Sequence, residues 1–256
     1  MPDHPGAVLL TGAASGIGRA TALRLAESGA ALALLDRDNT GLAETAERAR
    51  AGGAAEVSEH VVDVSSGADM QAAATDAVRA LGGLTGIVSA AGVLIPARLD
   101  ETSSDDLQHH LAVNTFGVLH CLHAASAHLG PDGAVVIVSS NAARVPRTGM
   151  LGYAASKAAA STLARCAGLE LAGRGIRCNV VEPGSTDTPM QRDLWSDPEA
   201  GRVAAIDGDP ESYRVGIPLR RIADPDDVAA VVCFLLSPQA RHITLQQLYV
   251  DGGAPL

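Results

Sequence analysis

The chain has 256 residues, of which 47% are hydrophobic and 19% are charged, a composition that excludes an intrinsically disordered protein. Its formal net charge of -10 argues against a nucleic acid or an anionic membrane as the partner, because both attract basic surfaces. Only 2% of the residues are aromatic, so we expect a core built mainly from Ala, Val, Leu and Ile.

Short apolar runs alternate along the chain with segments of helical periodicity. We expect strands at residues 7–10, 30–35, 56–62, 84–89, 134–139, 176–181 and 245–250. We expect helices at residues 18–28, two more that end near residues 50 and 81, and then at 105 to about 129, 151–172 and 226–236. Apolar strands that alternate with helices indicate a parallel sheet buried on both faces. The prediction is a single α/β domain over residues 1–256, with a doubly wound, seven-stranded sheet of the Rossmann type.

Residues 186–215 interrupt this alternation. They are rich in Asp, Pro, Gly and Arg, contain the only tryptophan, Trp195, and directly follow the sixth expected strand. A long irregular segment within a compact domain often covers a ligand site. We interpret the segment as a lid, with an ordinary surface excursion as the alternative.

The cysteines and histidines show no metal-binding or disulfide spacing. We expect no metal site, and four free, buried thiols in a reducing cytoplasm: Cys121, Cys166, Cys178 and Cys233. His109 and His110 lie in a polar helix start and are interpreted as surface residues. The N-terminal sequence lacks a basic region followed by a long apolar run, so we predict no signal peptide. No apolar stretch reaches the roughly 18 residues that span a bilayer.

A glycine-rich turn, TGAASGIG at residues 11–18, joins the first expected strand to the first helix. Gly12, Gly16 and Gly18 allow a tight turn, and the helix after them offers free N–H groups to a pyrophosphate. Three glycines alone are weak evidence, but their place between a strand and a helix strengthens it. Ser15 and Ile17 belong to the same turn and to the same predicted cofactor site.

Asp36 ends the second expected strand, where a carboxylate can accept hydrogen bonds from the ribose hydroxyls of adenosine and repel a 2′-phosphate. The prediction is therefore NAD rather than NADP, although the guanidinium of Arg37 could bind that phosphate. Asp63 and Val64 follow the third strand, where an adenine could lie. Small residues follow the fourth strand and would let a cofactor approach the sheet: Ala91 and Gly92.

Tyr153 and Lys157, in the sequence YAASK, are four residues apart on an expected helix and so share one face. Lys157 is the only lysine, beside 18 arginines, and Tyr153 is one of three tyrosines. A nearby ammonium lowers the pKa of a phenol and makes it a better base. Chance placement of the lysine is the alternative.

Ser140 ends the fifth expected strand, at the edge where a doubly wound sheet binds its ligand. Its hydroxyl can contact a substrate oxygen beside the tyrosine. Ser139 competes for that role, but successive strand residues face opposite ways, so only one points into the site. Asn114 is an unfavourable residue in mid-helix. It is either a tolerated polar side chain or holds a water against Lys157 in a proton relay.

Together, TGAASGIG, Asp36, AAG, Asn114, Ser140, YAASK and NVVEPGSTDT resemble the classical short-chain dehydrogenase/reductase family over essentially the whole chain. The resemblance implies a homotetramer and a catalytic tetrad of Asn114, Ser140, Tyr153 and Lys157. It also implies a cofactor half at about residues 1–130, a catalytic half at about 131–256, and a nicotinamide site at Pro183, Gly184, Thr186 and Thr188. Ser89 departs from the family pattern, which usually has asparagine there.

The C-terminal third resembles two groups of enzymes within this family. One oxidises the carbon 3 alcohol of 2,3-dihydro-2,3-dihydroxybenzoate in siderophore pathways, and the other oxidises 2,3-dihydro-3-hydroxyanthranilate, which carries an amine at carbon 2. Asn141 stands where the siderophore enzymes have aspartate. Together with the Ala- and Arg-rich composition, Asn141 makes 2,3-dihydro-3-hydroxyanthranilate the first predicted substrate, with 3-hydroxyanthranilate as the product. The dihydroxy acid is the alternative. A carbonyl reductase and a dinucleotide-sensing regulator are further alternatives.

Both substrates carry a carboxylate, which a guanidinium binds with two parallel hydrogen bonds. Arg147 is the first candidate for this contact and Arg144 the second, with a solvated surface charge as the alternative for each. The predicted ring pocket further contains Asn141, Met150, Met190 and Gln191.

Overall fold

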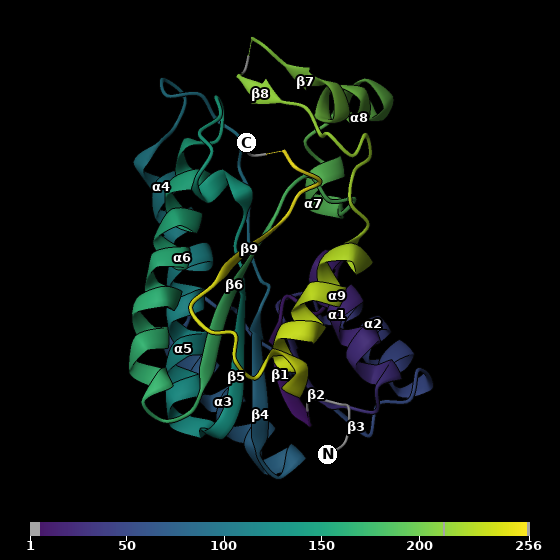
Figure 1. Cartoon of the computed structure of the whole chain (residues 1–256), viewed down its shortest axis with the longest axis vertical. Coiled ribbons are helices and arrows are strands. Elements are labelled where there is room, and N and C mark those ends of the chain that lie inside the picture. The colour runs from purple at the N-terminus through teal and green to yellow at the C-terminus, as the bar shows by residue number, and fades with distance from the viewer. Residues whose placement is uncertain (1–5, 212, 255–256) are drawn as a thin grey trace.

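Seven parallel strands form the central sheet, in the order β3-β2-β1-β4-β5-β6-β9 (Figure 1). The structure is a computed structural model and describes residues 6–211 and 213–254. The strands are β1 (Ala7–Thr11), β2 (Ala31–Asp36), β3 (Glu56–Val61), β4 (Leu84–Ser89), β5 (Leu129–Val138), β6 (Arg177–Pro183) and β9 (Gln247–Val250). The predicted seven-stranded, doubly wound fold is confirmed. The strand order reverses between β1 and β4, where such sheets open a crevice at their carboxyl edge.

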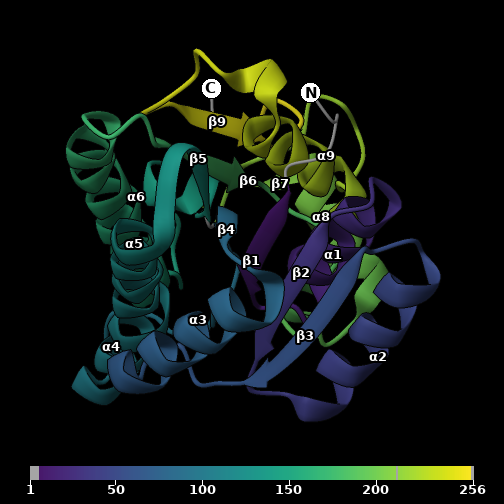
Figure 2. The same cartoon turned by 90° about the horizontal axis from the view of Figure 1, so that it is seen from below.

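Helices cover both faces of the sheet (Figures 1 and 2). One layer contains α3 (Gly67–Leu81), α5 (Gly117–His128) and α6 (Leu151–Ala172), and the other contains α1 (Gly16–Glu27), α2 (Asn39–Ala51) and α9 (Pro225–Leu236). Short 3-10 turns lie at η2 (Asn141–Ala143) and η3 (Pro238–Ala240). Local sequence explains several ends: Asp224 and Asp227 form a capping box before α9, and Gly82 ends α3 in the left-handed conformation.

The core forms two apolar layers, one on each side of the sheet. Neighbouring strand residues alternate between them, so Leu9 packs under the α3–α5–α6 layer and Leu10 under the α1–α2–α9 layer. Both side chains are fully buried, and burying each one stabilises the fold by about 1.5–3 kcal/mol. Two-sided burial is the reason that central strands such as β1 and β2 read as continuous apolar runs, whereas the edge strand β3 is largely exposed and polar.

The helix expected from residue 105 to about 129 is more complex than predicted. It consists of α4 (Ser104–His110), a π-helical segment η1 (Leu111–Phe116) and α5, and Asn114 lies within the π-helical segment. The strand β5 begins at Leu129, earlier than the expected Ala134. Its first residues, Gly130 to Gly133, are turn formers, and Asp132 has a φ of 67°, so the sequence pattern concealed them.

Residues 186–211 and 213–215 are less irregular than predicted. They contain the helices α7 (Pro189–Arg192) and α8 (Pro198–Asp207) and the antiparallel hairpin β7 (Gly208–Asp209) and β8 (Arg214–Val215). Thr188 and Asp197 cap the two helices, each with a proline as the next residue. These short elements lie together beyond the end of β6 (Figure 1).

The expected burial or exposure of three residues is wrong. His110 is buried, at 1% exposure, although His109 is exposed as expected. Cys121 and Cys178 are buried, but Cys166 is exposed and Cys233 is partly exposed. Within residues 6–211 and 213–254, no helix has the length and apolarity to cross a membrane, and no three His, Cys, Asp or Glu side chains could hold a metal ion.

Candidate active site

The glycine-rich turn lies against the backbone that follows β4. Gly12 has a φ of 74°, and a Cβ atom there would be 2.6 Å from the backbone nitrogen of Ala91. A Cβ atom on Gly18 would overlap the carbonyl oxygen of Gly12. Only glycine fits either position, so the turn leaves open the space in front of the N-terminus of α1. This is the arrangement that a pyrophosphate needs.

A cleft of about 330 Å³ follows this turn along the carboxyl edge of the sheet. The predicted cofactor residues that line it are Gly12, Ser15, Gly16, Ile17, Gly18, Asp36, Arg37, Asp63, Val64, Ala91, Gly92 and Thr188. The other three predicted residues, Pro183, Gly184 and Thr186, line an adjoining cavity. Ile17, Thr188 and Met190 line both spaces, so the two spaces meet there.

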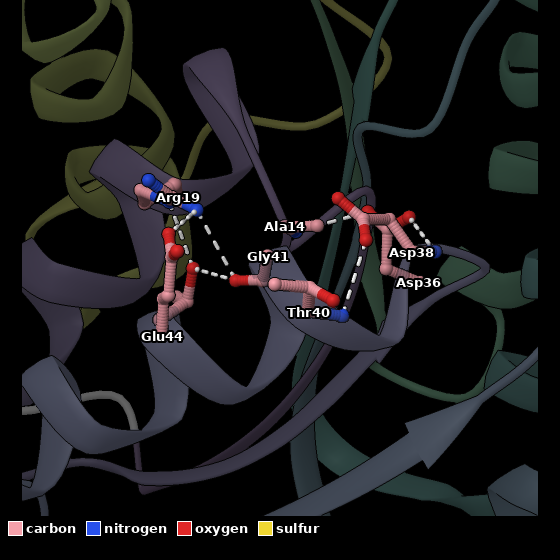
Figure 3. Close-up of polar contacts among 8 residues, drawn as sticks. Ala14, Arg19, Asp36, Asp38, Thr40, Gly41 and Glu44 are labelled. Carbon is pink, nitrogen blue, oxygen red and sulfur yellow. Dashed lines mark hydrogen bonds and ion pairs between the residues drawn. The ribbon is translucent and has the colours of Figure 1, made fainter.

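Asp36 is held rigidly at the end of β2 (Figure 3). One oxygen of its carboxylate accepts a hydrogen bond from the Ala14 N–H at 2.9 Å, and the other accepts one from the Asp38 N–H at 3.0 Å. In the same view, Arg19 joins α1 to α2 by donating to the Gly41 carbonyl and the Glu44 carboxylate. The two backbone hydrogen bonds fix the negative charge of Asp36 at the rim of the cleft.

Tyr153 and Lys157 lie on one buried face of α6, as the sequence predicts. They are 8% and 4% exposed, and Lys157 Nζ is 5.9 Å from the centroid of the tyrosine ring. Lys157 Nζ donates a hydrogen bond to the carbonyl oxygen of Val138 at 3.0 Å, and the Ser140 hydroxyl is hydrogen-bonded to Tyr153. The arrangement places a hydroxyl, a phenol and an ammonium in one small volume.

The electrostatics of Tyr153 differ from the prediction. Burial raises the pKa of Tyr153, while the Ser140 hydrogen bond and the Arg147 charge lower it. Lys157 is not among these influences, and burial lowers the pKa of its own ammonium to about 8. In the protein alone, therefore, Ser140 and Arg147 are the groups that favour the phenolate of Tyr153. The prediction differed because the sequence pattern did not account for the desolvation of Tyr153 and Lys157.

Asn114 holds the backbone beside this site. Its side-chain oxygen accepts from the Val93 N–H at 2.8 Å, and its amide donates to the Val93 carbonyl and the Ser156 hydroxyl, each at 2.9 Å. A Cβ atom on Gly92 would be 3.2 Å from Asn114 Oδ1 and 3.3 Å from Lys157 Nζ, so both side chains adjoin Gly92. The proton relay through water stays a prediction.

Strand alternation separates the two serines as expected. Ser140 points to Tyr153, whereas the Ser139 hydroxyl donates to the Lys157 carbonyl at 3.1 Å and accepts from Ser161 at 2.8 Å. Ser161 also contacts the buried carboxylate of Glu182 at 3.0 Å. Ser139 thus anchors α6 to the sheet beneath the site.

A cavity of about 300 Å³ adjoins Tyr153 and Ser140, a volume at the small end of the range for ligand pockets. Of the predicted substrate residues it brings together Asn141, Arg147, Met150, Met190 and Gln191. Arg147 donates to Asn141 Oδ1 at 3.1 Å. Arg144 does not line this cavity, is exposed and is hydrogen-bonded to Tyr249, so the structure does not support its predicted role.

The sequence reasoning missed two residues near the chemistry. Arg214 of β8 lines the cavity together with Arg147, but nothing in its local sequence distinguishes it from a surface arginine. His110 lies edge-on to the Tyr153 ring, with ring centroids 6.4 Å apart, and its Nε2 accepts from the Ile95 N–H at 3.0 Å. The polar residues around His110 in the sequence gave no signal of its burial.

A Rossmann-type sheet with this turn and a buried Tyr–Lys pair beside it defines an oxidoreductase that uses a nicotinamide cofactor. The family model described as Enoyl-(Acyl carrier protein) reductase matches residues 12–255. The chain belongs to the short-chain dehydrogenase/reductase family.

Individual proteins of known name are similar to this chain over nearly its whole length. The chain is 42% identical over 249 residues to 2,3-dihydro-2,3-dihydroxybenzoate dehydrogenase of Bacillus subtilis (strain 168), covering 96% of this chain and 95% of that protein. It is 41% identical over 251 residues to the Escherichia coli (strain K12) enzyme of the same name, with 97% and 96% covered. A solved short-chain dehydrogenase from Burkholderia cenocepacia J2315 in complex with NADP is 32% identical, with a TM-score of 0.89 and both chains covered completely.

Proposed function

We propose that the protein oxidises the carbon 3 alcohol of 2,3-dihydro-2,3-dihydroxybenzoate with NAD and yields 2,3-dihydroxybenzoate. The observation that carries this proposal is the 41–42% identity over nearly the whole chain to two dehydrogenases named for that substrate. This similarity favours the dihydroxy acid over 2,3-dihydro-3-hydroxyanthranilate, the first prediction from the sequence.

Asn141 does not by itself decide the group at carbon 2. Its amide oxygen accepts from Arg147, while its buried Nδ2 has no hydrogen-bond partner among the described residues. Because this nitrogen is buried, it is not a donor that the cavity offers to a ligand, and the choice of the hydroxyl rests on the relatives.

The chain's own residues divide the chemistry as follows. Tyr153 takes the proton of the carbon 3 hydroxyl, and Ser140 holds the substrate oxygen and favours the phenolate. Lys157 supplies positive charge beneath them, and Asn114 fixes the backbone around Gly92. NAD held by the residues of the cleft would supply the acceptor for the hydride of carbon 3. The resulting ketone tautomerises to the aromatic ring, which makes the overall reaction strongly favourable.

NAD is proposed over NADP on the position of Asp36. Both of its oxygens are held by backbone N–H groups at the rim of the cleft, so the carboxylate cannot turn away from a 2′-phosphate without losing two hydrogen bonds. Arg37 lines the same rim and is the group that would favour NADP. The homotetramer implied by the family resemblance stays a prediction.

Incubation of the purified protein with NAD and the dihydroxy acid tests the proposal. We expect NADH and 2,3-dihydroxybenzoate in equal amounts. If neither this acid nor its amino analogue is oxidised, the substrate class is wrong, and reduction of simple carbonyl compounds becomes the next activity to measure. A regulator without turnover is disfavoured, because Tyr153, Ser140 and Lys157 are assembled in one buried site.

A further inference from the structure

Two arginines line the cavity beside Tyr153, and the charge of one acts on the other. Arg147 comes from the segment between β5 and α6, and Arg214 comes from β8 of the hairpin. The two elements are distant in the sequence, and the fold brings their arginines to one space of about 300 Å³. Two cations in so small a cavity indicate an anionic ligand.

Each guanidinium donates a hydrogen bond to one uncharged side chain and has further N–H donors. Arg147 donates to Asn141 Oδ1 at 3.1 Å, and Arg214 donates to the Ser185 hydroxyl at 2.7 Å. These are the only side-chain hydrogen bonds of either arginine within the described part of the chain. A guanidinium has five N–H donors, so most of them stay available to a ligand. The Ser185 contact also fastens the hairpin to the segment that follows β6.

No contact with an acidic side chain neutralises the positive charges of Arg147 and Arg214 within the described residues. Burial lowers the pKa of Arg147, with Tyr153 and Asp251 acting in the opposite direction. Burial also lowers the pKa of Arg214, Arg147 lowers it further, and Asp209 raises it. Among residues 6–211 and 213–254, neither arginine forms an ion pair within 4.0 Å with Asp251, Asp209 or any other acid.

We propose that Arg147 and Arg214 together bind the carboxylate of the substrate, so that the β7–β8 hairpin is part of the substrate site. This inference rests on the proposed function, which supplies a substrate with one carboxylate on a small ring. A carboxylate between the guanidiniums relieves their mutual repulsion and forms charge-assisted hydrogen bonds. The predicted lid thereby gains a specific role: one of its arginines recognises the acid group.

The test compares two ligands that differ only in this group, 2,3-dihydroxybenzoate and 2,3-dihydroxybenzamide. Their dissociation constants are measured on the wild-type protein saturated with NADH and on Arg214→Gln. We expect the substitution to weaken the acid about 10- to 100-fold, the range for a charged hydrogen bond, and the amide less than about threefold. Arg214→Lys should fall between wild type and Arg214→Gln, because it keeps the charge and loses the fork.

The matched control is Arg202→Ala, an exposed arginine of α8 that is paired with Glu199 outside the cavity. It should change neither dissociation constant. Equal weakening of acid and amide by Arg214→Gln, or no weakening of either, would overturn the carboxylate role of Arg214. Turnover of the dihydroxy acid by the wild-type protein is measured separately, so the proposed function can stand while this inference fails.

Discussion

Lys157 Nζ lies 5.9 Å from the centroid of the Tyr153 ring and donates a hydrogen bond to the carbonyl oxygen of Val138. The two side chains share a buried face of α6, one turn apart. Val138 precedes the serine pair at the end of β5, so the same contact joins the helix to the strand that carries Ser140. A Cβ atom on Gly92 would be 3.3 Å from Nζ, so the space beside Nζ suits a compact ammonium better than the wider guanidinium of arginine.

Replacement of Tyr153 by Phe removes the proposed proton acceptor and keeps the ring that packs against His110. We expect kcat to fall about 10²- to 10⁴-fold, the usual contribution of a positioned base. The dissociation constant for NAD should stay within about twofold. Tyr249→Phe is the control, because that tyrosine contacts Arg144 outside the cavity. Normal turnover by Tyr153→Phe would refute the assignment.

The pH profile of kcat/KM reports the ionisation of Tyr153. The Ser140 hydrogen bond and the Arg147 charge lower the pKa of Tyr153, against the effect of burial. Loss of either influence should move the acidic limb of the profile to higher pH, because the phenolate then forms only in more alkaline solution. Arg147→Gln and Ser140→Ala should both show this shift.

Arg144→Gln is the matched control for this experiment. Arg144 is exposed and acts on Tyr249 rather than on Tyr153, so its loss should leave the acidic limb in place. A profile that is identical in wild type, Ser140→Ala and Arg147→Gln would show that another group controls the limb.

Lys157 links stability to pH. Burial lowers the pKa of its ammonium from 10.5 to about 8. Below pH 8 the lysine is protonated in both the folded and the unfolded state, and the cost of burying the charge is constant. Between about pH 8 and 10.5 the unfolded chain binds more protons, so the free energy of unfolding should rise with pH, by up to about 3 kcal/mol.

Urea unfolding at several pH values checks this sign. Wild type should gain stability relative to Lys157→Met as the pH rises from 7 to 10, because the methionine variant has no charge to lose. A difference between the two proteins that stays constant with pH would mean that Lys157 is not desolvated as the structure indicates.

Cofactor choice depends on the charge of Asp36. Asp36→Asn should raise the ratio of kcat/KM for NADP to that for NAD by about tenfold or more, since a repulsion of about 1.4 kcal/mol is removed. Glu44→Gln removes a charge that is near in space but outside the cleft, and it should not alter the ratio (Figure 3). An unchanged ratio in Asp36→Asn would contradict the ribose assignment.

The glycine-rich turn offers a test of close packing. Gly12 and Gly29 both have positive φ, 74° and 78°, but only Gly12 has backbone atoms within reach of a new Cβ atom. Gly29→Ala should lose about 1–2 kcal/mol from left-handed strain alone. Gly12→Ala should lose more in thermal unfolding, and it should also weaken NAD at least about tenfold. Equal losses of stability would show that the turn is not packed against Ala91.

Apolar patterning was sufficient to predict the sheet, because every central strand is buried on both faces and Leu9 and Leu10 serve opposite core layers. The β7–β8 hairpin was not predictable in this way. Its strands have two residues each, and Arg214 is polar, so its placement depends on tertiary contacts such as the one with Ser185.

In the candidate site, too, the features set by local sequence were predictable and those set by tertiary burial were not. Spacing on one helix predicted that Tyr153 and Lys157 share a face, and strand alternation predicted which serine turns inward. Neither rule carries information on desolvation, so the direction of the Tyr153 pKa shift was missed. His110 was misjudged for a similar reason: two of its partners, Ile95 and Tyr153, lie outside its own helix.

Oxidation of 2,3-dihydro-2,3-dihydroxybenzoate is tested by measuring kcat/KM with NAD for this acid and, beside it, for 2,3-dihydro-3-hydroxyanthranilate. We expect a higher value for the dihydroxy acid, because two relatives that are 41–42% identical over nearly the whole chain are named for that substrate. A higher value for 2,3-dihydro-3-hydroxyanthranilate would contradict the proposed substrate.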